Sequence, residues 1–208
     1  MPFFPLYISL EDQPVLLVGG GRVALRKAQS LAPFGCRITA AAQAFCPGWE
    51  DVDARRLVGR LTGAEPHLWD RPWALVIAAS SDAALNHRIS AEAQARRIPV
   101  NAVDDRAWCT FYFPALVRRG DVVVGVCGAG KAPFYTRRLR AELERAVPAG
   151  DGAVLDALES QRPEARRAGA QAADRLIDTL RAALERDPHL TRSQLEELCR
   201  AFWREEAP

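Results

Sequence analysis

Two adjacent carboxylates, Asp104 and Asp105, stand in the stretch PVNAVDDRAWCTFYFP, between an apolar run and an aromatic one. The apolar residues 98–103 before them predict a strand, which brings Asp104 to the carboxyl end of that strand. Ligands bind at this edge in open α/β sheets, so a carboxylate there belongs either to a catalytic site or to a turn or cap. Asp105 fits the second description, as a solvated neighbour or a helix cap.

A glycine cluster is the second chemical feature, because GGGRVA directly follows an apolar run at residues 15–18. It fits the pattern G-x-G-x-x-A as Gly19, Gly21 and Ala24. Gly19 permits a tight turn, Gly21 lets the backbone approach a pyrophosphate, and Ala24 lets helix and strand pack closely. The helix that follows would receive the anion at its N-terminus. The alternative is a glycine-rich turn that binds no ligand.

The type of dinucleotide depends on the end of the next predicted strand, residues 36–42. An acid at this end holds the ribose in most NAD sites, but this chain reads Ala41-Ala42-Gln43. Gln43 can hydrogen-bond the ribose less strongly, and Arg22 can tolerate a 2′-phosphate. The choice between NAD and NADP stays open on this feature.

Basic residues gather at positions 118–119, 131 and 137–140, although the net charge of the chain is only +2. Such a local cluster favours a polyanionic ligand of limited size over nucleic acid. Lys131 follows the turn Gly128-Ala129-Gly130, which is a second candidate anion site ahead of a helix that opens near Pro133. The alternative for each of these residues is an ordinary solvated surface charge.

These residues need a fold that positions them. Strands are predicted at residues 15–18, 36–42, 74–79 and 98–103, with helices from about 22 to 34 and from Ser81 or Asp82 to about Arg97, and Gly35 as a C-terminal cap. After a turn at 119–121 come a strand at 122–127 and the helix near Pro133, and residues from 151 onward are helical. We therefore expect an α/β protein with an N-terminal Rossmann-like parallel sheet, a small α+β region and a C-terminal helical region. The predicted domains are 1–112, 113–148 and 149–208.

Composition indicates a cytoplasmic protein without a membrane span or a permanent metal. No stretch approaches the roughly 18 apolar residues that a span needs. The N-terminus MPFFPLYISLED lacks a basic region, so we expect it to pack into the fold and not to be a signal peptide. Five cysteines, odd in number and widely spaced, argue against disulfides and zinc, and the three histidines form no ligand motif.

Several motifs occur together: GGGRVALRK, AASSDAALN, VNAVD, FYFP, and GKAP before an arginine-rich helix. From Pro5 to about Pro148 they resemble the precorrin-2 dehydrogenase/sirohydrochlorin ferrochelatase family, which also forms the N-terminal module of bacterial siroheme synthases. The resemblance implies NAD-dependent oxidation of precorrin-2 to sirohydrochlorin, possible insertion of ferrous iron as a second substrate to give siroheme, and a homodimer formed through the region 113–148. It also leads us to expect a standalone enzyme without the methyltransferase domain, and no nucleic-acid or membrane partner.

The resemblance also assigns site residues. Asp104 falls on the family's key aspartate, which would take a proton as a hydride leaves the macrocycle and could contact iron transiently. Cofactor contacts are expected at Gly19, Gly21, Arg22, Val23, Gln43, Ala44 and Ser80. The substrate's carboxylates are expected at Lys131, Arg137, Arg118 and Arg119. Gly128 stands where the family usually has a serine, which weakens the case for iron insertion.

Two other functions remain open. One is a different NAD(P) oxidoreductase on the same fold, because a fold alone does not determine the chemistry. The other is a non-catalytic protein that binds tetrapyrrole or dinucleotide. Asp104 argues against the second, because binding alone does not require a base.

Overall fold

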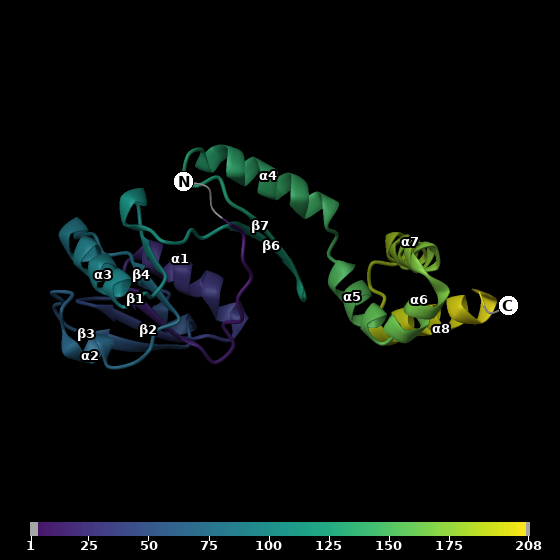
Figure 1. Ribbon diagram of the computed structural model, residues 1–208, viewed down its shortest axis with the longest axis horizontal. Coiled ribbons are helices and arrows are strands. Elements are labelled where there is room, and N and C mark those ends of the chain that lie inside the picture. The colour runs from purple at the N-terminus through teal and green to yellow at the C-terminus, as the bar shows by residue number, and fades with distance from the viewer. Residues whose placement is uncertain (1–3, 207–208) are drawn as a thin grey trace. The chain divides into compact units, whose positions relative to one another are not determined.

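The computed structural model describes residues 4–206, in two compact units that meet in sequence between Phe113 and Pro114 (Figure 1). The first unit corresponds to the predicted Rossmann-like domain. The second contains both the α+β and the helical regions. The division that we expect near residue 148 stays a prediction.

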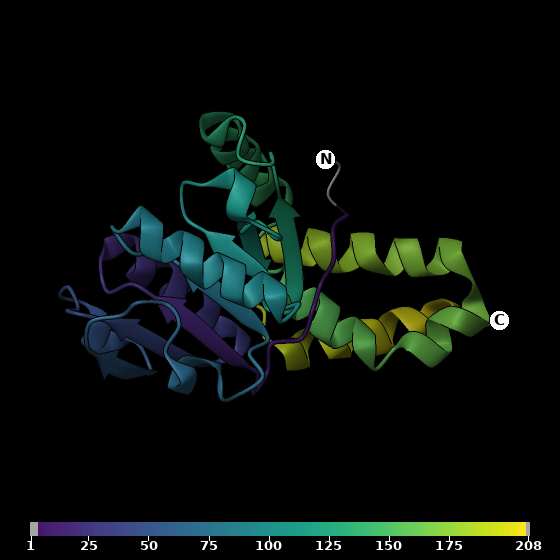
Figure 2. The same ribbon diagram turned by 60° about the vertical axis from the view of Figure 1, so that its left-hand side comes forward.

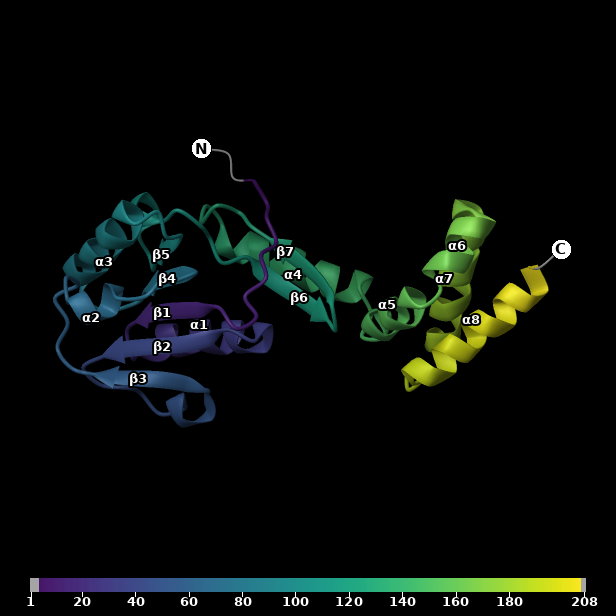
Figure 3. The same ribbon diagram turned by 60° about the horizontal axis from the view of Figure 1, so that its bottom comes forward.

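The first unit is built on a parallel sheet in the order β3-β2-β1-β4-β5 (Figure 3). Its strands are β1 (Pro14–Val18), β2 (Arg37–Ala42), β3 (Ala54–Val58), β4 (Leu75–Ala78) and β5 (Val100–Ala102). Val15 pairs with Ile38 on one side and Leu75 on the other, which makes β1 the central strand. Strands covered on both faces have continuous apolar sequences, and β1 and β4 show this pattern.

Helices cover both faces of this sheet. Alternate residues of β1 divide between the two faces: Leu17 packs with α1 (Arg22–Leu31) and Leu16 packs with α3 (Ala83–Ala95). Figure 2 shows α3 in front of the sheet and α1 behind it. The short helix α2 (Pro66–Trp69) adds Leu68 to the α3 side. Strand order reverses between β1 and β4, and this switch point opens a crevice at the carboxyl ends of the strands.

Most of the predicted elements are confirmed. The N-cap of α3 is Asp82, whose carboxylate accepts the backbone N–H of Leu85 at 3.1 Å. Gly35 ends the α1 segment in the left-handed conformation, with φ of 69°. The sequence analysis did not predict β3 or α2. Strand β3 escapes notice because it is an edge strand with exposed arginines, so its sequence, ARRLV, lacks the apolar signature of the inner strands.

The second unit begins with the antiparallel strands β6 (Ala115–Arg119) and β7 (Val122–Val126), joined by a tight turn at Gly120. Helix α4 (Pro133–Ala146) packs on this hairpin. Four more helices follow: α5 (Asp151–Glu159), α6 (Arg162–Ala168), α7 (Ala170–Arg186) and α8 (Arg192–Glu206). Residues of α5, α7 and α8 form their core, with Leu176, Leu180 and Leu195 fully buried.

The N-terminal segment differs from our expectation. Residues 4–9 are exposed, and Leu10 is the first described residue to be buried. The prediction that this segment packs into the fold is therefore wrong for residues 4–9, and residues 1–3 lie outside the described part of the chain. Within residues 4–206, no helix has the length and apolar character to cross a membrane.

Candidate functional site

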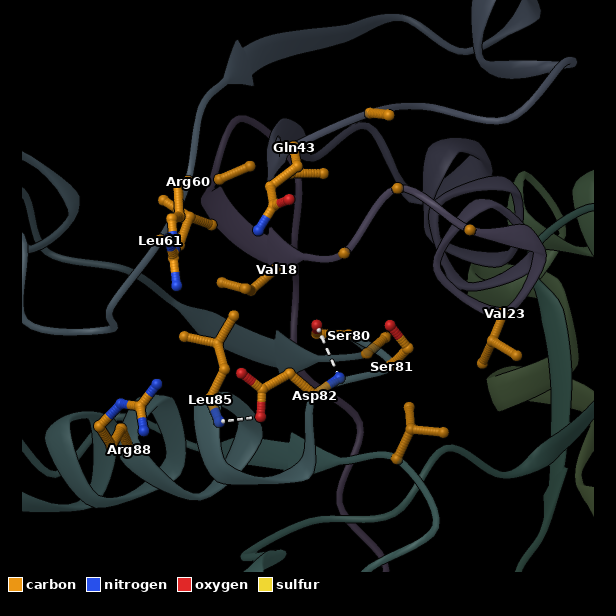
Figure 4. A pocket seen from close by; sticks show the side chains of 18 of the residues that line it. Val18, Val23, Gln43, Arg60, Leu61, Ser80, Ser81, Asp82, Leu85 and Arg88 are labelled. Carbon is orange, nitrogen blue, oxygen red and sulfur yellow. Dashed lines mark hydrogen bonds between the residues drawn. The ribbon is translucent and has the colours of Figure 1, made fainter.

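A cavity of about 700 Å³ lies at the carboxyl edge of the parallel sheet (Figure 4). It is lined by the turns that follow β1, β2, β3 and β4, and by Val103 and Asp104 after β5. Convergence of strand ends from both sides of the switch point explains why one pocket collects residues distant in sequence. The volume falls in the range of small-molecule and cofactor sites.

The three glycines after β1 have different roles. Gly19 has φ of 135°, and a Cβ there would stand 2.4 Å from the carbonyl oxygen of Ala79. A Cβ on Gly20 would stand 1.9 Å from the carbonyl oxygen of Ala44. Gly21, by contrast, has no heavy atom within 4 Å of its Cβ position and lines the cavity. Protein packing therefore requires the first two glycines, and Gly21 leaves open space where a ligand can approach the backbone.

This loop is also the start of α1. Gly21 is the N-cap of α1, and it has no side-chain capping hydrogen bond within the described chain. The buried indole of Trp49 donates its Nε1–H to the carbonyl of Gly20 at 3.0 Å, and this bond ties the loop to the segment after β2. Free N–H groups at a helix N-terminus favour an anion, so the loop has the geometry of a pyrophosphate cradle.

The turn after β4 forms the facing wall. Asn86 accepts the N–H of Ser80 at 3.0 Å and donates to the Ser80 carbonyl at 2.9 Å. These reciprocal bonds hold Ser80 in the pocket wall and give the AASSDAALN motif a structural explanation. Asp82 and Ser81 complete the turn and also line the cavity.

Asp104 is exposed at the cavity and has a left-handed backbone, with φ of 61°. The loop around it is bound to the sheet: Asn101 donates to the Phe111 carbonyl at 3.1 Å, and Cys109 Sγ donates to the Ala102 carbonyl at 3.1 Å. Positive φ is uncommon outside glycine, although aspartate tolerates it better than most residues. The loop contacts therefore support an unusual backbone conformation at a residue that lines the pocket.

Asp105 has a different role. Its Oδ1 accepts the N–H of Ala107 at 3.2 Å, which caps the short 3-10 helix Arg106–Trp108. Its Oδ2 lies 2.7 Å from His87 Nε2, and the His87 ring stacks on Trp108 at 4.6 Å. The expectation of a cap is confirmed, and the pair with His87 attaches the Asp104 loop to α3.

Lys27, on α1, lies close to the same loop. Its Nζ stands 3.8 Å from the ring centroid of Phe113. Burial, followed by the positive charge of Arg26, lowers the pKa of Lys27 to about 8. Electrostatic interactions with Cys109 and then with Asp104 oppose this shift in the pKa of Lys27. A partly desolvated ammonium group therefore lies near the carboxylate-bearing loop.

All the residues predicted to contact the cofactor line the cavity: Gly19, Gly21, Arg22, Val23, Gln43, Ala44 and Ser80. Asp104 lines it too. Their roles stay predictions, but the fold brings the set together. The sequence analysis missed Arg60, Leu61, Thr62 and Arg88, which line the same cavity. Without β3, no sequence signal places residues 60–62 beside the end of β2.

The predicted substrate-binding residues belong to the second unit. Lys131 and Arg137 are exposed, and Arg118 Nε donates to the Gly120 carbonyl at 3.0 Å. Arg119 is half-buried: its Nη2 lies 3.6 Å from Glu144 Oε1, and its Nη1 donates to the Arg118 carbonyl. Lys131 and Arg137 are therefore freer than Arg119 to meet a ligand.

The cavity fits a dinucleotide by three observations: open space at Gly21, an uncapped helix start, and polar groups at the end of β2. Gly21 and the first turn of α1 would hold the pyrophosphate, Gln43 the ribose, and Ser80 the nicotinamide side. Groups of three or more His, Cys, Asp or Glu residues able to hold a metal ion do not occur among residues 4–206. The five cysteines are all free thiols.

Comparison with known proteins agrees with this geometry. Residues 6–115 match a protein family described as "Putative NAD(P)-binding". The chain belongs to this NAD(P)-binding family. The chain is also similar to siroheme synthases: that of Sodalis glossinidius (strain morsitans) is 43% identical over 152 residues, covering 71% of this chain and 31% of the relative.

The siroheme synthase of Ectopseudomonas mendocina (strain ymp) is likewise 43% identical, over 156 residues, covering 75% of this chain and 33% of the relative. This chain thus matches about a third of the length of these relatives. Among solved structures, one titled "SirC, precorrin-2 dehydrogenase" covers 97% of this chain and all of its own, with a TM-score of 0.64 and 18% identity. The likeness confirms the predicted fold class, an α/β Rossmann-like unit with a helical C-terminal part.

Proposed function

We propose that this protein oxidises precorrin-2 to sirohydrochlorin, with NAD as the hydride acceptor, in siroheme biosynthesis. The observation that carries the proposal is a single cavity that has a pyrophosphate cradle at Gly21 and the Asp104 carboxylate. The siroheme synthase relatives and the fold of a precorrin-2 dehydrogenase support the choice of substrate.

The reaction removes two hydrogens from the macrocycle, one as hydride and one as a proton. NAD, when bound, would accept the hydrogen that leaves as hydride. We assign the second to Asp104, an exposed residue that lines the cavity and whose carboxylate would accept the proton as the hydride leaves. The left-handed turn and the loop contacts at Asn101 and Cys109 hold this base in place.

The substrate's own charges suggest the role of the basic residues. Precorrin-2 carries several carboxylates, and arginine and lysine side chains bind such groups by charge-assisted hydrogen bonds. Lys131 and Arg137 are exposed and so suit this role best. Arg118 and Arg119 are the secondary candidates, since Arg119 already faces Glu144.

We also propose a homodimer formed through the second unit. Helix α4 packs on the β6–β7 hairpin, yet among the residues of these three elements only Val117 is buried. On the same helix, Phe134 is 71% exposed and Tyr135 is 55% exposed. A partner subunit that covers such side chains would complete a core. Light scattering coupled to size-exclusion chromatography tests this, and a monomer at micromolar concentration would contradict it.

We extend the proposal to a second reaction, the insertion of ferrous iron into sirohydrochlorin to give siroheme. We assign any iron contact to Asp104, as a transient ligand for an incoming substrate ion. Five free thiols suit a reducing compartment, so we place the reaction in the cytoplasm.

The test is anaerobic conversion of enzymatically made precorrin-2, followed by absorbance with NAD present or absent, and with ferrous iron added in a second phase. We compare wild type with Asp104→Asn, because asparagine keeps the shape of the side chain and tolerates positive φ. Asp53→Asn is the control, since Asp53 is exposed and outside the cavity. We expect NAD-dependent turnover in wild type and Asp53→Asn, and a loss of about 100-fold or more in Asp104→Asn.

Two results would count against the proposal. Equal turnover in Asp104→Asn and wild type would remove Asp104 as the base. No turnover in wild type, with NAD still bound, would favour a tetrapyrrole- or dinucleotide-binding protein. Iron insertion faster than the protein-free rate would add the chelatase activity.

A further inference from the structure

The end of the pocket beside β2 is basic and has no carboxylate. Gln43 follows β2 and Arg60 follows β3, and both line the cavity. Their strands are paired in parallel, and the N–H of Gly59 donates to the Ala42 carbonyl at 3.0 Å. This hydrogen bond joins the residues immediately before Arg60 and Gln43, so the two side chains start from neighbouring strand ends. Figure 4 shows both pointing into the pocket.

A second arginine, on α3, is bonded to the loop that carries Arg60. Arg88 lines the cavity, and its Nε donates to the carbonyl of Thr62, two residues beyond Arg60. This hydrogen bond anchors the Arg88 guanidinium against the loop that carries Arg60. Arg60 itself is exposed. Two guanidinium groups from different elements therefore line the cavity on the side of the loop that follows β3.

The acids near this end do not neutralise these arginines. Asp82 and Asp104, the carboxylates that line the cavity, follow β4 and β5. Glu65 accepts the N–H of Thr62 and, at 2.9 Å, the N–H of Gly63, and it does not line the cavity. The salt bridges of the described chain include neither Arg60 nor Arg88. Positive charge at this end is thus available to a ligand.

The end of the second strand is where a Rossmann-like pocket distinguishes its dinucleotides. An acid there hydrogen-bonds the ribose 2′-hydroxyl of NAD and repels a phosphate, whereas an arginine accommodates the 2′-phosphate of NADP. We propose that this pocket binds NADP as well as NAD, with Arg60 as the principal contact of the 2′-phosphate and Gln43 and Arg88 beside it. The inference rests on the proposed dinucleotide site and adds a phosphate subsite to it.

The experiment is isothermal titration of the full-length protein with NAD and, separately, with NADP. Wild type is compared with Arg60→Ala and with Arg55→Ala, a matched control because Arg55 is an exposed arginine on β3 outside the cavity. We expect wild type to bind NADP at least as tightly as NAD. Arg60→Ala should weaken NADP about tenfold or more, since it removes a charge-assisted hydrogen bond to phosphate, and leave NAD within about twofold. Arg55→Ala should change neither.

The outcomes separate this inference from the function on which it rests. NAD binding with NADP more than tenfold weaker in wild type would overturn the phosphate subsite and leave the dinucleotide site standing. Equal losses of NAD and NADP in Arg60→Ala would also overturn it, because Arg60 would then act on the whole cofactor. Binding of neither dinucleotide would overturn both the subsite and the proposed cofactor.

Discussion

Alanine at Gly21 should abolish tight dinucleotide binding without unfolding the protein. The backbone there has φ of −81° and ψ of −179°, which alanine adopts without strain. No heavy atom lies within 4 Å of the new Cβ. Alanine is a poorer N-cap residue than glycine, which lowers the stability of the folded state. Alanine also reduces the conformational entropy of the unfolded chain, which raises the stability. The net change in the free energy of unfolding should therefore stay within about 1 kcal/mol.

The Gly21→Ala substitution should lower the affinity for the dinucleotide, although it leaves the fold intact. Gly21 lines the cavity at the start of α1, where a pyrophosphate has to approach the backbone. A methyl group in that space displaces the phosphates from the N–H groups of the first turn. We expect the affinity for NAD to fall about tenfold or more, which is a loss of about 1.4 kcal/mol or more. Titration calorimetry measures the affinity, and urea denaturation measures the stability.

Gly19→Ala is the matched comparison within the same loop. Its Cβ would stand 2.4 Å from the Ala79 carbonyl oxygen, and its φ of 135° is unfavourable for alanine. Overpacking costs about 1–3 kcal/mol and the strained backbone about 1–3 kcal/mol more, so the variant should lose about 2–6 kcal/mol of stability. Gly21→Ala that binds NAD like wild type would refute the pyrophosphate cradle. Gly19→Ala as stable as wild type would refute the loop geometry.

Three further predictions concern charged groups. The pKa of Lys27 is about 8 in the folded protein and about 10.5 in the unfolded chain, so the cost of burying its charged form disappears as pH rises through this range. Relative to Lys27→Met, the unfolding free energy of wild type should therefore rise by about 1–2 kcal/mol between about pH 8 and 10.5. Urea denaturation at several pH values measures this. His87→Phe keeps a ring on Trp108 but loses the 2.7 Å contact with Asp105. Because both side chains of this pair are more than a third exposed, the unfolding free energy should fall by less than about 1 kcal/mol. A larger loss in urea denaturation would contradict this account. Asp151→Asn removes a 2.7 Å pair with Arg181 at a nearly buried carboxylate and should cost about 1–3 kcal/mol, measured by thermal and urea unfolding; unchanged stability would show that the pair contributes nothing.

The sequence alone determined the central architecture of the first unit. Its inner strands are continuous apolar runs, and the glycine loop and the Asp82 cap are local signals that depend only on neighbouring residues. The glycine pattern and the family resemblance predicted the cofactor contacts, and the fold gathers these residues because parallel strands bring their carboxyl ends to one edge. The place of Asp104 after an apolar run left both a catalytic site and a turn or cap open, and the family resemblance favoured the catalytic role.

Tertiary structure decided what local patterns do not encode. Strand β3 gains its place by pairing with β2, and its exposed arginines give no apolar periodicity to read. Arg60 and Arg88 therefore join the pocket only when β3 and α3 are packed beside the end of β2. The left-handed turn at Asp104 is likewise held by contacts from Asn101 and Cys109, whose partners are set by the folded loop. Strand order and loop contacts arise from long-range burial and hydrogen bonding, so they became visible only in the folded chain.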